Sequence, residues 1–414
     1  MSSLLSSLLP SYACGTSRKM VSVEDRYFSL NRALLLTIGL WPYKKSKLAR
    51  LHLIFFFSIL ITSVIFQFTT FVTSNCTTDL IIKVLCVACF QICLIIMYNS
   101  FYVNAGAMRW LMEQTQCIYN DIKDDNEIAI IEKYGSHAKR CTAMLTIFVV
   151  CVICTIIIAP FWQDFCHMIL LINQSQAHRL YIRTEYFIDE EKYFYLLFLH
   201  MNVAYCIGLL TILATGTMLM VHLLHACGMF SIANYRIQHA MEINTHYTQN
   251  VILPYENMIY ERLIDAIDMH RKAMMCSKYI ITSFEKSFML LIGFGVLSLS
   301  LNMYRIFQIV RVDHNIEEFC ILFLFTSCII LYMFLTNFTG QKIIDHNNNI
   351  FITVYDIQWY ITSLHTQKLI LFLLQRKNKV FGLYIGGLFL ASLQYFATLT
   401  NASISYFTIM YSIE

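Results

Sequence analysis

The chain has 414 residues, of which 57% are hydrophobic and only 14% are charged, against about 25% charged residues in ordinary soluble domains. Its net charge of +4 is too small to indicate nucleic-acid binding, and its 4 Pro and 13 Gly exclude collagen-like and low-complexity chains. With a mean hydropathy of +0.58, the composition predicts an all-α polytopic membrane protein whose surface contacts membrane lipids.

The first 50 residues precede the first long apolar run and form a predicted N-terminal segment of their own. Residues 1–10 contain two Leu pairs but lack the basic start of a secretory signal peptide. The apolar run at 51–73 is too long for a signal sequence, so we expect it to stay in the membrane.

Seven apolar runs are long enough to cross a bilayer, which takes about 20 helical residues. The fourth and seventh exceed this length and should continue beyond the bilayer or bend. Pro160 should end or kink the third. The first six form a membrane region at 51–338 and the last forms a C-terminal region at 380–414. The runs cover residues 51–73, 80–103, 142–162, 194–223, 288–308, 319–338 and 380–413.

Lys and Arg residues gather on alternate connections between these runs. Residues 1–50, 104–141, 225–286 and 339–379 together hold 24 of the 30 Lys and Arg residues. Cytoplasmic loops are enriched in these residues, so the pattern predicts a cytoplasmic N-terminus and, after seven spans, an extracellular C-terminus. A metabotropic seven-span receptor that acts through a G protein has the opposite topology and is kept as the alternative.

Two glycosylation sequons and two cysteines fall in the predicted outer loops. Asn75 and Asn173 are the glycosylation candidates, and Cys76 and Cys166 could form a disulfide. Most of the 15 Cys lie within apolar runs, where even the two C-x-x-C pairs are interpreted as packing residues. No metal site and no cofactor are predicted.

The longer cytoplasmic connections, at 104–140, 224–286 and 339–379, mix charged residues with apolar residues at helical spacing. In the second of them, Ile259 and Leu263 begin such a pattern. We expect helices that extend below the membrane and pack into an anchoring layer between subunits. Solvated amphipathic helices without a partner are the alternative.

The last apolar run carries a stripe of six uncharged polar residues at spacings of four and three, within an arc of about 80° on one helix face. Ile409 borders the stripe, Glu414 lies beyond it, and the Gly386-Gly387 pair before it permits close helix packing or a bend. The stripe faces either the water of a pore or polar groups of neighbouring helices, and the residues alone leave both open. The stripe comprises Gln394, Thr398, Asn401, Ser405, Thr408 and Ser412.

Motifs of catalysis are missing from the chain. It contains none of the signatures of zinc proteases, Walker-type NTPases, α/β-hydrolases or dinucleotide-binding enzymes, so no enzyme activity is predicted. His200 is interpreted as a packed residue, and Arg305, near the end of the fifth run, is expected to snorkel to the membrane surface. A transporter ranks low, because no inverted repeat or pair of broken helices is visible.

Several short motifs resemble those of insect odorant receptors, in a style closest to hymenopteran members. They are Gly-Leu-Trp-Pro at 39–42, before the first span, and Ser-Tyr-Phe-Thr at 405–408, which is similar to the family's terminal signature. The resemblance follows the whole chain in topology and is strongest over 340–413. The cytoplasmic motif before the last helix contains Tyr355, Asp356, Trp359 and Tyr360.

The resemblance implies a subunit of a heterotetrameric, ligand-gated, non-selective cation channel in the plasma membrane of sensory dendrites. Such a subunit binds small volatile odorants and pairs with a common odorant co-receptor. The family's seventh helix lines the pore, which places the gate at Ile409 and the next polar pore position at Ser412. The short connection at 224–286 implies a tuning subunit rather than the co-receptor. A gustatory channel of the same superfamily is the alternative, although Ser412-Ile413 departs from the gustatory Gln-Phe ending.

The resemblance also places the odorant in the outer half of the bundle, among the second to sixth helices. That region offers apolar and aromatic residues with a few polar groups, as small-molecule pockets require. Each of these residues also suits ordinary packing. The candidate contacts are Phe90, Gln91, Cys154, Ile158, Trp162, Met201, Tyr205 and Phe325.

Overall fold

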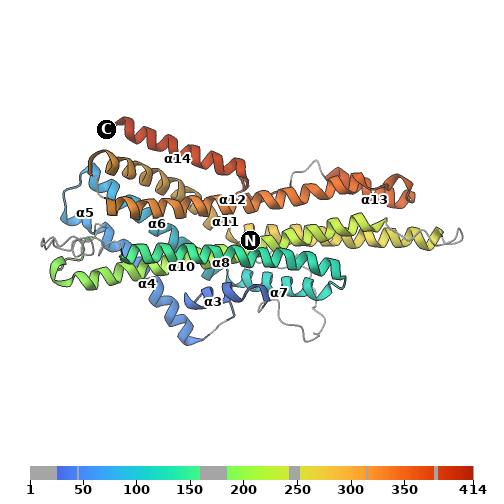
Figure 1. Ribbon diagram of the computed structural model, residues 1–414, viewed down its shortest axis with the longest axis horizontal. Coiled ribbons are helices and arrows are strands. Elements are labelled where there is room, and N and C mark those ends of the chain that lie inside the picture. Colours follow the sequence, from blue (N-terminus) through green and yellow to red (C-terminus); the bar gives the residue numbers. More distant parts are fainter. Residues whose placement is uncertain are drawn as a thin grey trace, which may run out of the picture.

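The chain forms an elongated bundle of long helices, with α14 and the C-terminal end along one edge and α4 along another (Figure 1). The sequence-based predictions for Trp162, Cys166, Asn173 and Glu414 lie outside the residues that the structure describes. The computed structural model describes residues 26–43, 46–158, 184–241, 252–313, 316–376 and 381–413.

Among the described residues, six helices are long and apolar enough to cross a membrane, and they correspond to the first six predicted runs. One of them has 51 residues, or about 75 Å at 1.5 Å per residue, against a hydrocarbon core of about 30 Å. Helices of this length extend well beyond a bilayer. The six are α4 (Lys47–Phe68, continued by α5, Thr70–Thr73), α6 (Thr78–Val103), α8 (Asp125–Ile158), α10 (Glu190–Ala240), α11 (Ile252–Gln308) and α12 (Ile316–Asp356).

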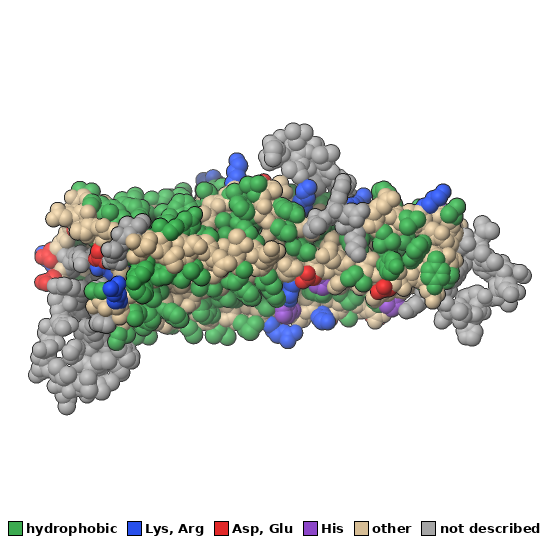
Figure 2. Space-filling view, turned by 90° about the horizontal axis from the view of Figure 1, so that it is seen from above, with side chains coloured by type: hydrophobic (Ala, Val, Ile, Leu, Met, Phe, Trp, Pro, Cys, Tyr) green, Lys and Arg blue, Asp and Glu red, His purple; other side chains and the backbone are tan. Residues whose placement is uncertain are grey.

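The surface changes along the long axis of the bundle. On the face seen in Figure 2, charged side chains lie at one end and scattered along the opposite half, and the part between them is mainly hydrophobic. A belt of this kind is what a membrane-spanning region requires, because unpaired charges are costly in hydrocarbon.

A short N-terminal helix, α3 (Ser29–Thr37), packs against α10. The Asn31 side-chain amide donates a hydrogen bond of 2.9 Å to the Thr217 hydroxyl, and both side chains are buried. The Phe28 ring lies 5.2 Å from the ring of His222. The segment before the first span is therefore docked into the bundle, and α10 at the centre also contacts α4, α6, α8, α11 and α12.

Arg305 does not snorkel to the surface as expected, because only 1% of its side chain is exposed. It lies near the end of α11, where the first turns of α6 and α12 bring Asp79 and Glu318 within reach. Carboxylates are favourable in the first turn of a helix, and here they also neutralise the buried guanidinium. The expectation failed because both partners come from other helices.

The helix at the C-terminal end begins later in the sequence than the predicted seventh apolar run at 380–413. The helix in this region is α14 (Leu393–Ile413), preceded by a short antiparallel hairpin of β1 (Tyr384–Ile385) and β2 (Phe389–Leu390). Gly386 and Gly387 form its turn with φ angles of 62° and 68°, which only Gly adopts readily. The Gly pair therefore neither packs two helices together nor bends one. Helix α14 is not among the six candidate spans, and its polar residues lower its hydropathy.

The chain just after the hairpin is fixed to α12. The backbone N–H of Ser392 donates to Asn337 Oδ1 at 3.2 Å, and that of Leu393 donates to Gln341 Oε1 at 3.4 Å. Between these two acceptors, Gly340 has no side chain and lets the Ala391 carbonyl approach its backbone closely. Helix α14 thus starts from a fixed point on α12 and contacts both α11 and α12.

The remaining elements are short. A π-helical turn, η2 (Ile309–Asp313), follows α11, and α13 lies at the opposite end of the bundle from α5 (Figure 1). The other elements are α7 (Ala105–Asp121), η3 (Trp359–Ile361) and α13 (Leu364–Gln375).

Candidate functional site

Three of the predicted ligand contacts form a buried aromatic stack. The Phe90 ring of α6 lies 4.7 Å from the Phe325 ring of α12 at an interplanar angle of 23°. The Tyr205 ring of α10 lies 5.3 Å from the same Phe325 ring, at an interplanar angle of 28°. None of the three is more than 2% exposed. Residues from three helices are thus brought together at one level of the bundle.

A small polar cluster adjoins this stack. The Gln91 side-chain carbonyl accepts hydrogen bonds from the Gln67 amide at 2.9 Å and from the Ser63 hydroxyl at 3.2 Å. The sequence analysis predicted Gln91 as a ligand contact but did not predict Gln67 and Ser63 on α4. These two polar residues are spaced by one helical turn within an apolar span. This spacing could have indicated that they face the interior, since polar residues in spans usually do so.

The other candidate contacts separate into two groups. Met201, one turn from Tyr205 on α10, is buried, with 4% of its surface exposed. Cys154 and Ile158 on α8 are exposed, because the buried face of this helix carries Val152 and Ile156 instead. The described geometry therefore gives Cys154 and Ile158 no place in the interior of the bundle.

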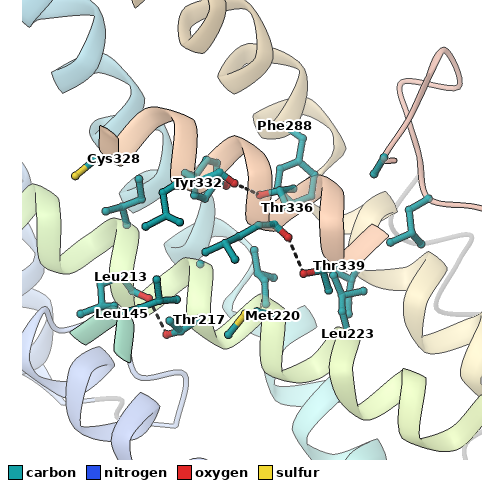
Figure 3. A pocket seen from close by; sticks show the side chains of 18 of the residues that line it. Leu145, Leu213, Thr217, Met220, Leu223, Phe288, Cys328, Tyr332, Thr336 and Thr339 are labelled. Atoms are coloured by element: carbon teal, nitrogen blue, oxygen red, sulfur yellow. Dashed lines mark hydrogen bonds between the residues drawn. The ribbon is translucent and has the colours of Figure 1, made fainter. Parts of the chain in front are cut away.

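Two adjoining cavities continue from the stack along the bundle. The first, of about 70 Å³, is lined by Phe90 and also by Tyr395 and Leu399 of α14. The second, of about 100 Å³, lies among α8, α10, α11, α12 and the hairpin (Figure 3). The two cavities share five lining residues, so an occupant of either would contact the wall of the other. The shared residues are Ile212, Phe288, Tyr332, Thr336 and Ile385.

The second cavity is mainly apolar, and its threonine hydroxyls are turned to their own helices. Thr217 donates to the Leu213 carbonyl at 2.7 Å, and Thr336 donates to the Tyr332 carbonyl at 2.9 Å (Figure 3). These bonds use the hydroxyl protons of the two threonines. Such a surface suits a small, mostly apolar molecule.

The polar stripe of α14 is exposed along its whole length. All six of its residues are exposed, and hydroxyls such as those of Ser405 and Ser412 donate to carbonyls of their own helix. Ile409 at the border is 52% exposed. The opposite face packs onto the bundle through Leu399 and Ser403, which are 7% and 0% exposed. Within this chain, the stripe is therefore not a polar packing seam.

Most of the other predicted positions are exposed or lie outside the described parts of the chain. Asn75 is exposed, as are Cys76 and the motif residues Tyr355 and Tyr360. Asp356 is exposed and Trp359 is half-buried in the same turn. In the described parts of the chain, no group of three or more His, Cys, Asp or Glu side chains could hold a metal ion.

Comparison with known proteins gives matches to one family and one fold. A family model described as 7tm Odorant receptor matches residues 77–404. The structure of the insect olfactory receptor OR5 from Machilis hrabei in complex with eugenol matches with a TM-score of 0.76 and 13% identity, over 95% of this chain and 99% of that chain. A second OR5 structure matches with a TM-score of 0.75 and 13% identity, over 94% and 98%. No curated protein matches the sequence.

Proposed function

Since the chain belongs to the 7tm odorant receptor family, we propose that it is the tuning subunit of an odorant-gated, non-selective cation channel. In this proposal it assembles with a co-receptor, as a heterotetramer in the plasma membrane of sensory neurons. Small volatile odorants bind inside the helical bundle and shift α14 between a closed and an open arrangement.

The observation that carries the proposal is the exposed polar stripe of α14. A stripe that faced lipid would be unfavourable, so water or other subunits must meet it. It is flanked by exposed apolar side chains, Ile404 and Tyr411 on one side and Ile409 on the other. If several copies of α14 surround an axis, the flank of Ile404 and Tyr411 packs between subunits and the stripe faces the pore. Ile409 then forms an apolar constriction that can gate by dewetting. The carboxylate of Glu414, two residues beyond Ser412 in the sequence, would favour cations at this end of the pore.

Exposed apolar residues near the α12–α13 turn support assembly with other subunits. Tyr360, Leu364 and Phe372 are 64%, 66% and 74% exposed. Exposed apolar residues in such number are typical of protein interfaces. We assign this end of the bundle to the cytoplasmic anchoring layer.

The two cavities support a route from odorant to pore. An occupant of the first cavity would contact Tyr395 and Leu399 of α14, and an occupant of the second would contact Leu383 and Ile385 of the hairpin before it. A ligand that fits these walls better in one arrangement of α14 would change the open fraction of the channel.

A matched pair of serines tests the pore assignment. Ser405→Cys places a thiol on the exposed stripe, and Ser403→Cys places one on the buried face of the same helix. Each variant is expressed with the co-receptor, and currents evoked by an odorant panel are recorded while a positively charged methanethiosulfonate is applied. We expect block at Ser405→Cys and the response of the parent channel at Ser403→Cys. Equal effects at both positions would count against a water-filled pore along the stripe.

A further inference from the structure

A further cavity, larger than either of the two inside the bundle, lies between the N-terminal segment and the first span. Its volume is about 420 Å³, within the range of about 300–1,000 Å³ that is usual for small-molecule sites. One wall is the end of α3 and the turn after it, with Leu36 and Trp41, and the other is the beginning of α4, with Leu51 and Phe55. We call this cavity the α3–α4 groove.

The two walls of the α3–α4 groove differ in how firmly the bundle holds them. On the α3 side, the buried hydroxyl of Tyr98 on α6 donates a hydrogen bond of 3.0 Å to the Ile38 carbonyl and fixes the turn to the bundle. On the α4 side, Leu48, Leu51 and Phe55 are 73%, 64% and 60% exposed. The groove therefore opens outward, and its exposed apolar rim calls for an apolar neighbour.

The groove lies near one end of the membrane-spanning region. Tyr98 is five residues before Val103, the last residue of α6, or about 7 Å along the helix axis. Helix α4 itself begins at Lys47. The rings of Trp41 and Tyr43 lie 5.9 Å apart beside the groove, and these two residue types gather at membrane interfaces. An occupant of the groove would thus span the boundary between the hydrocarbon and the head groups of one leaflet.

The sequence around the groove carries positive charge only. Residues 26–78 contain six Lys and Arg residues and no Asp or Glu. Lys47 and Arg50, in the first turn of α4, are exposed and form no ion pair with any residue in the described parts of the chain. The positive end of the α4 dipole lies at the same place. An anionic group is therefore favoured at this end of the groove.

We propose that the α3–α4 groove binds an anionic phospholipid of the cytoplasmic leaflet, with an acyl chain against Trp41 and Phe55 and the phosphate at the start of α4, near Lys47 and Arg50. The lipid joins α4 to the rest of the bundle. Only 17% of the residues in the most apolar stretch of α4 are buried by the protein, against 61% for α6, so α4 has few protein contacts of its own to hold it.

A lipid suits the groove better than a second subunit does. Helices α4 and α14 lie along opposite edges of the bundle (Figure 1). In the proposed channel α14 surrounds the axis, so α4 faces away from the other subunits and toward the bilayer. The choice of leaflet and of occupant rests on that proposed arrangement, whereas the groove and its charge do not.

Brominated phospholipids, which quench nearby tryptophan fluorescence, test the proposal on the purified full chain in detergent. Phosphatidylserine and phosphatidylcholine with the same brominated acyl chains are titrated separately. The contribution of Trp41 is the difference between the parent chain and Trp41→Phe. We expect phosphatidylserine to quench this contribution at a concentration at least about fivefold lower, which corresponds to the attraction of one Lys or Arg near an anionic lipid. Glycerophosphoserine, which has the head group without acyl chains, should not compete.

Two double variants that remove the same charge separate the groove from general attraction to anionic lipid. Lys47→Gln with Arg50→Gln should abolish the preference for phosphatidylserine. Lys139→Gln with Arg140→Gln, at two exposed positions of α8, should leave it unchanged. Equal quenching by the two lipids, no quenching of Trp41 by either, or the same loss in both double variants would overturn the proposal.

Native mass spectrometry of the same chains gives a second measurement that does not depend on fluorescence. The parent chain should retain a bound phosphatidylserine that the Lys47→Gln, Arg50→Gln variant loses, and a parent chain that retains none would also overturn the proposal. Neither measurement needs the co-receptor, an odorant or a current. A failure of the channel proposal would therefore leave both results as they are.

Discussion

Arg305 binds Glu318 through two parallel hydrogen bonds, from Nε to Oε1 at 2.7 Å and from Nη2 to Oε2 at 2.9 Å. Its Nη1 also lies 3.4 Å from Oδ1 of Asp79, which in turn binds Lys83 at 2.7 Å. One buried guanidinium thus joins the end of α11 to the first turns of α6 and α12. Phe307, two residues further along α11, packs edge-on against Tyr411 of α14 at 5.2 Å. The junction therefore also sets the surface on which α14 rests.

Removing the charge of Arg305 should destabilise the bundle. Arg305→Gln leaves the partly buried carboxylate of Glu318 without its bidentate partner, and loss of one member of a buried pair costs about 3 kcal/mol or more. The thermal unfolding of the purified chain measures the effect. The control is Arg271→Gln, whose ion pair with Asp268 is exposed and should contribute less than about 1 kcal/mol. Similar losses for both variants would contradict a structural role for the buried pair.

Shortening Ile409 should raise the basal current of the channel. In the proposed pore, Ile409→Ala widens the apolar constriction and lowers the cost of wetting it. Currents without odorant, normalised to surface expression, are the measurement. Ile404→Ala makes the same change at the opposite border of the stripe, where side chains are expected between subunits, and should raise the current less. If the basal current stays at the parent level in Ile409→Ala, the gate lies elsewhere.

The two turn glycines should differ in their tolerance of substitution. An L-residue at either position takes on an unfavourable positive φ, at a cost of about 1–2 kcal/mol. A Cβ at Gly386 would also come within 2.7 Å of the Met289 sulfur, whereas one at Gly387 meets nothing within 4 Å. Gly386→Ala should therefore lower thermal stability and odorant-evoked current more than Gly387→Ala. The reverse order would mean that the hairpin does not keep this position against α11.

Epitope tags at the two chain ends should show a topology opposite to that of G-protein-coupled receptors, with the N-terminus in the cytoplasm. The proposed orientation predicts that a C-terminal epitope is stained in intact cells, while an N-terminal epitope needs permeabilised cells. The opposite result would support a G-protein-coupled arrangement and remove the pore assignment of Gln394 to Ser412. An epitope of the same size at residues 242–251, within the predicted cytoplasmic connection at 224–286, serves as the control for membrane integrity.

The approximate depth of a residue along a span can be estimated from the sequence. Phe90, Tyr205 and Phe325 were expected in the outer half of the bundle as candidate ligand contacts, and in the structure the rings of Phe90 and Tyr205 both stack on Phe325. A helix rises about 1.5 Å per residue whatever its side chains, so position in the sequence converts directly to height. The partners of these residues were less predictable, since Gln67 meets Gln91 only through the packing of α4 on α6.

By itself, the sequence determined the apolar runs, the period of the polar stripe and the family motifs. All three are local patterns, because a helix repeats every 3.6 residues and a bilayer requires a minimum length of apolar chain. The tertiary structure alone decided which way each apolar helix turns. Cys154 and Ile158 were expected inside but face outward, while Val152 and Ile156 are buried. Lipid is as apolar as the protein interior, so hydrophobicity does not set the rotation of a span, and only packing against its neighbours does. The same packing brought Asp79 and Glu318 to Arg305.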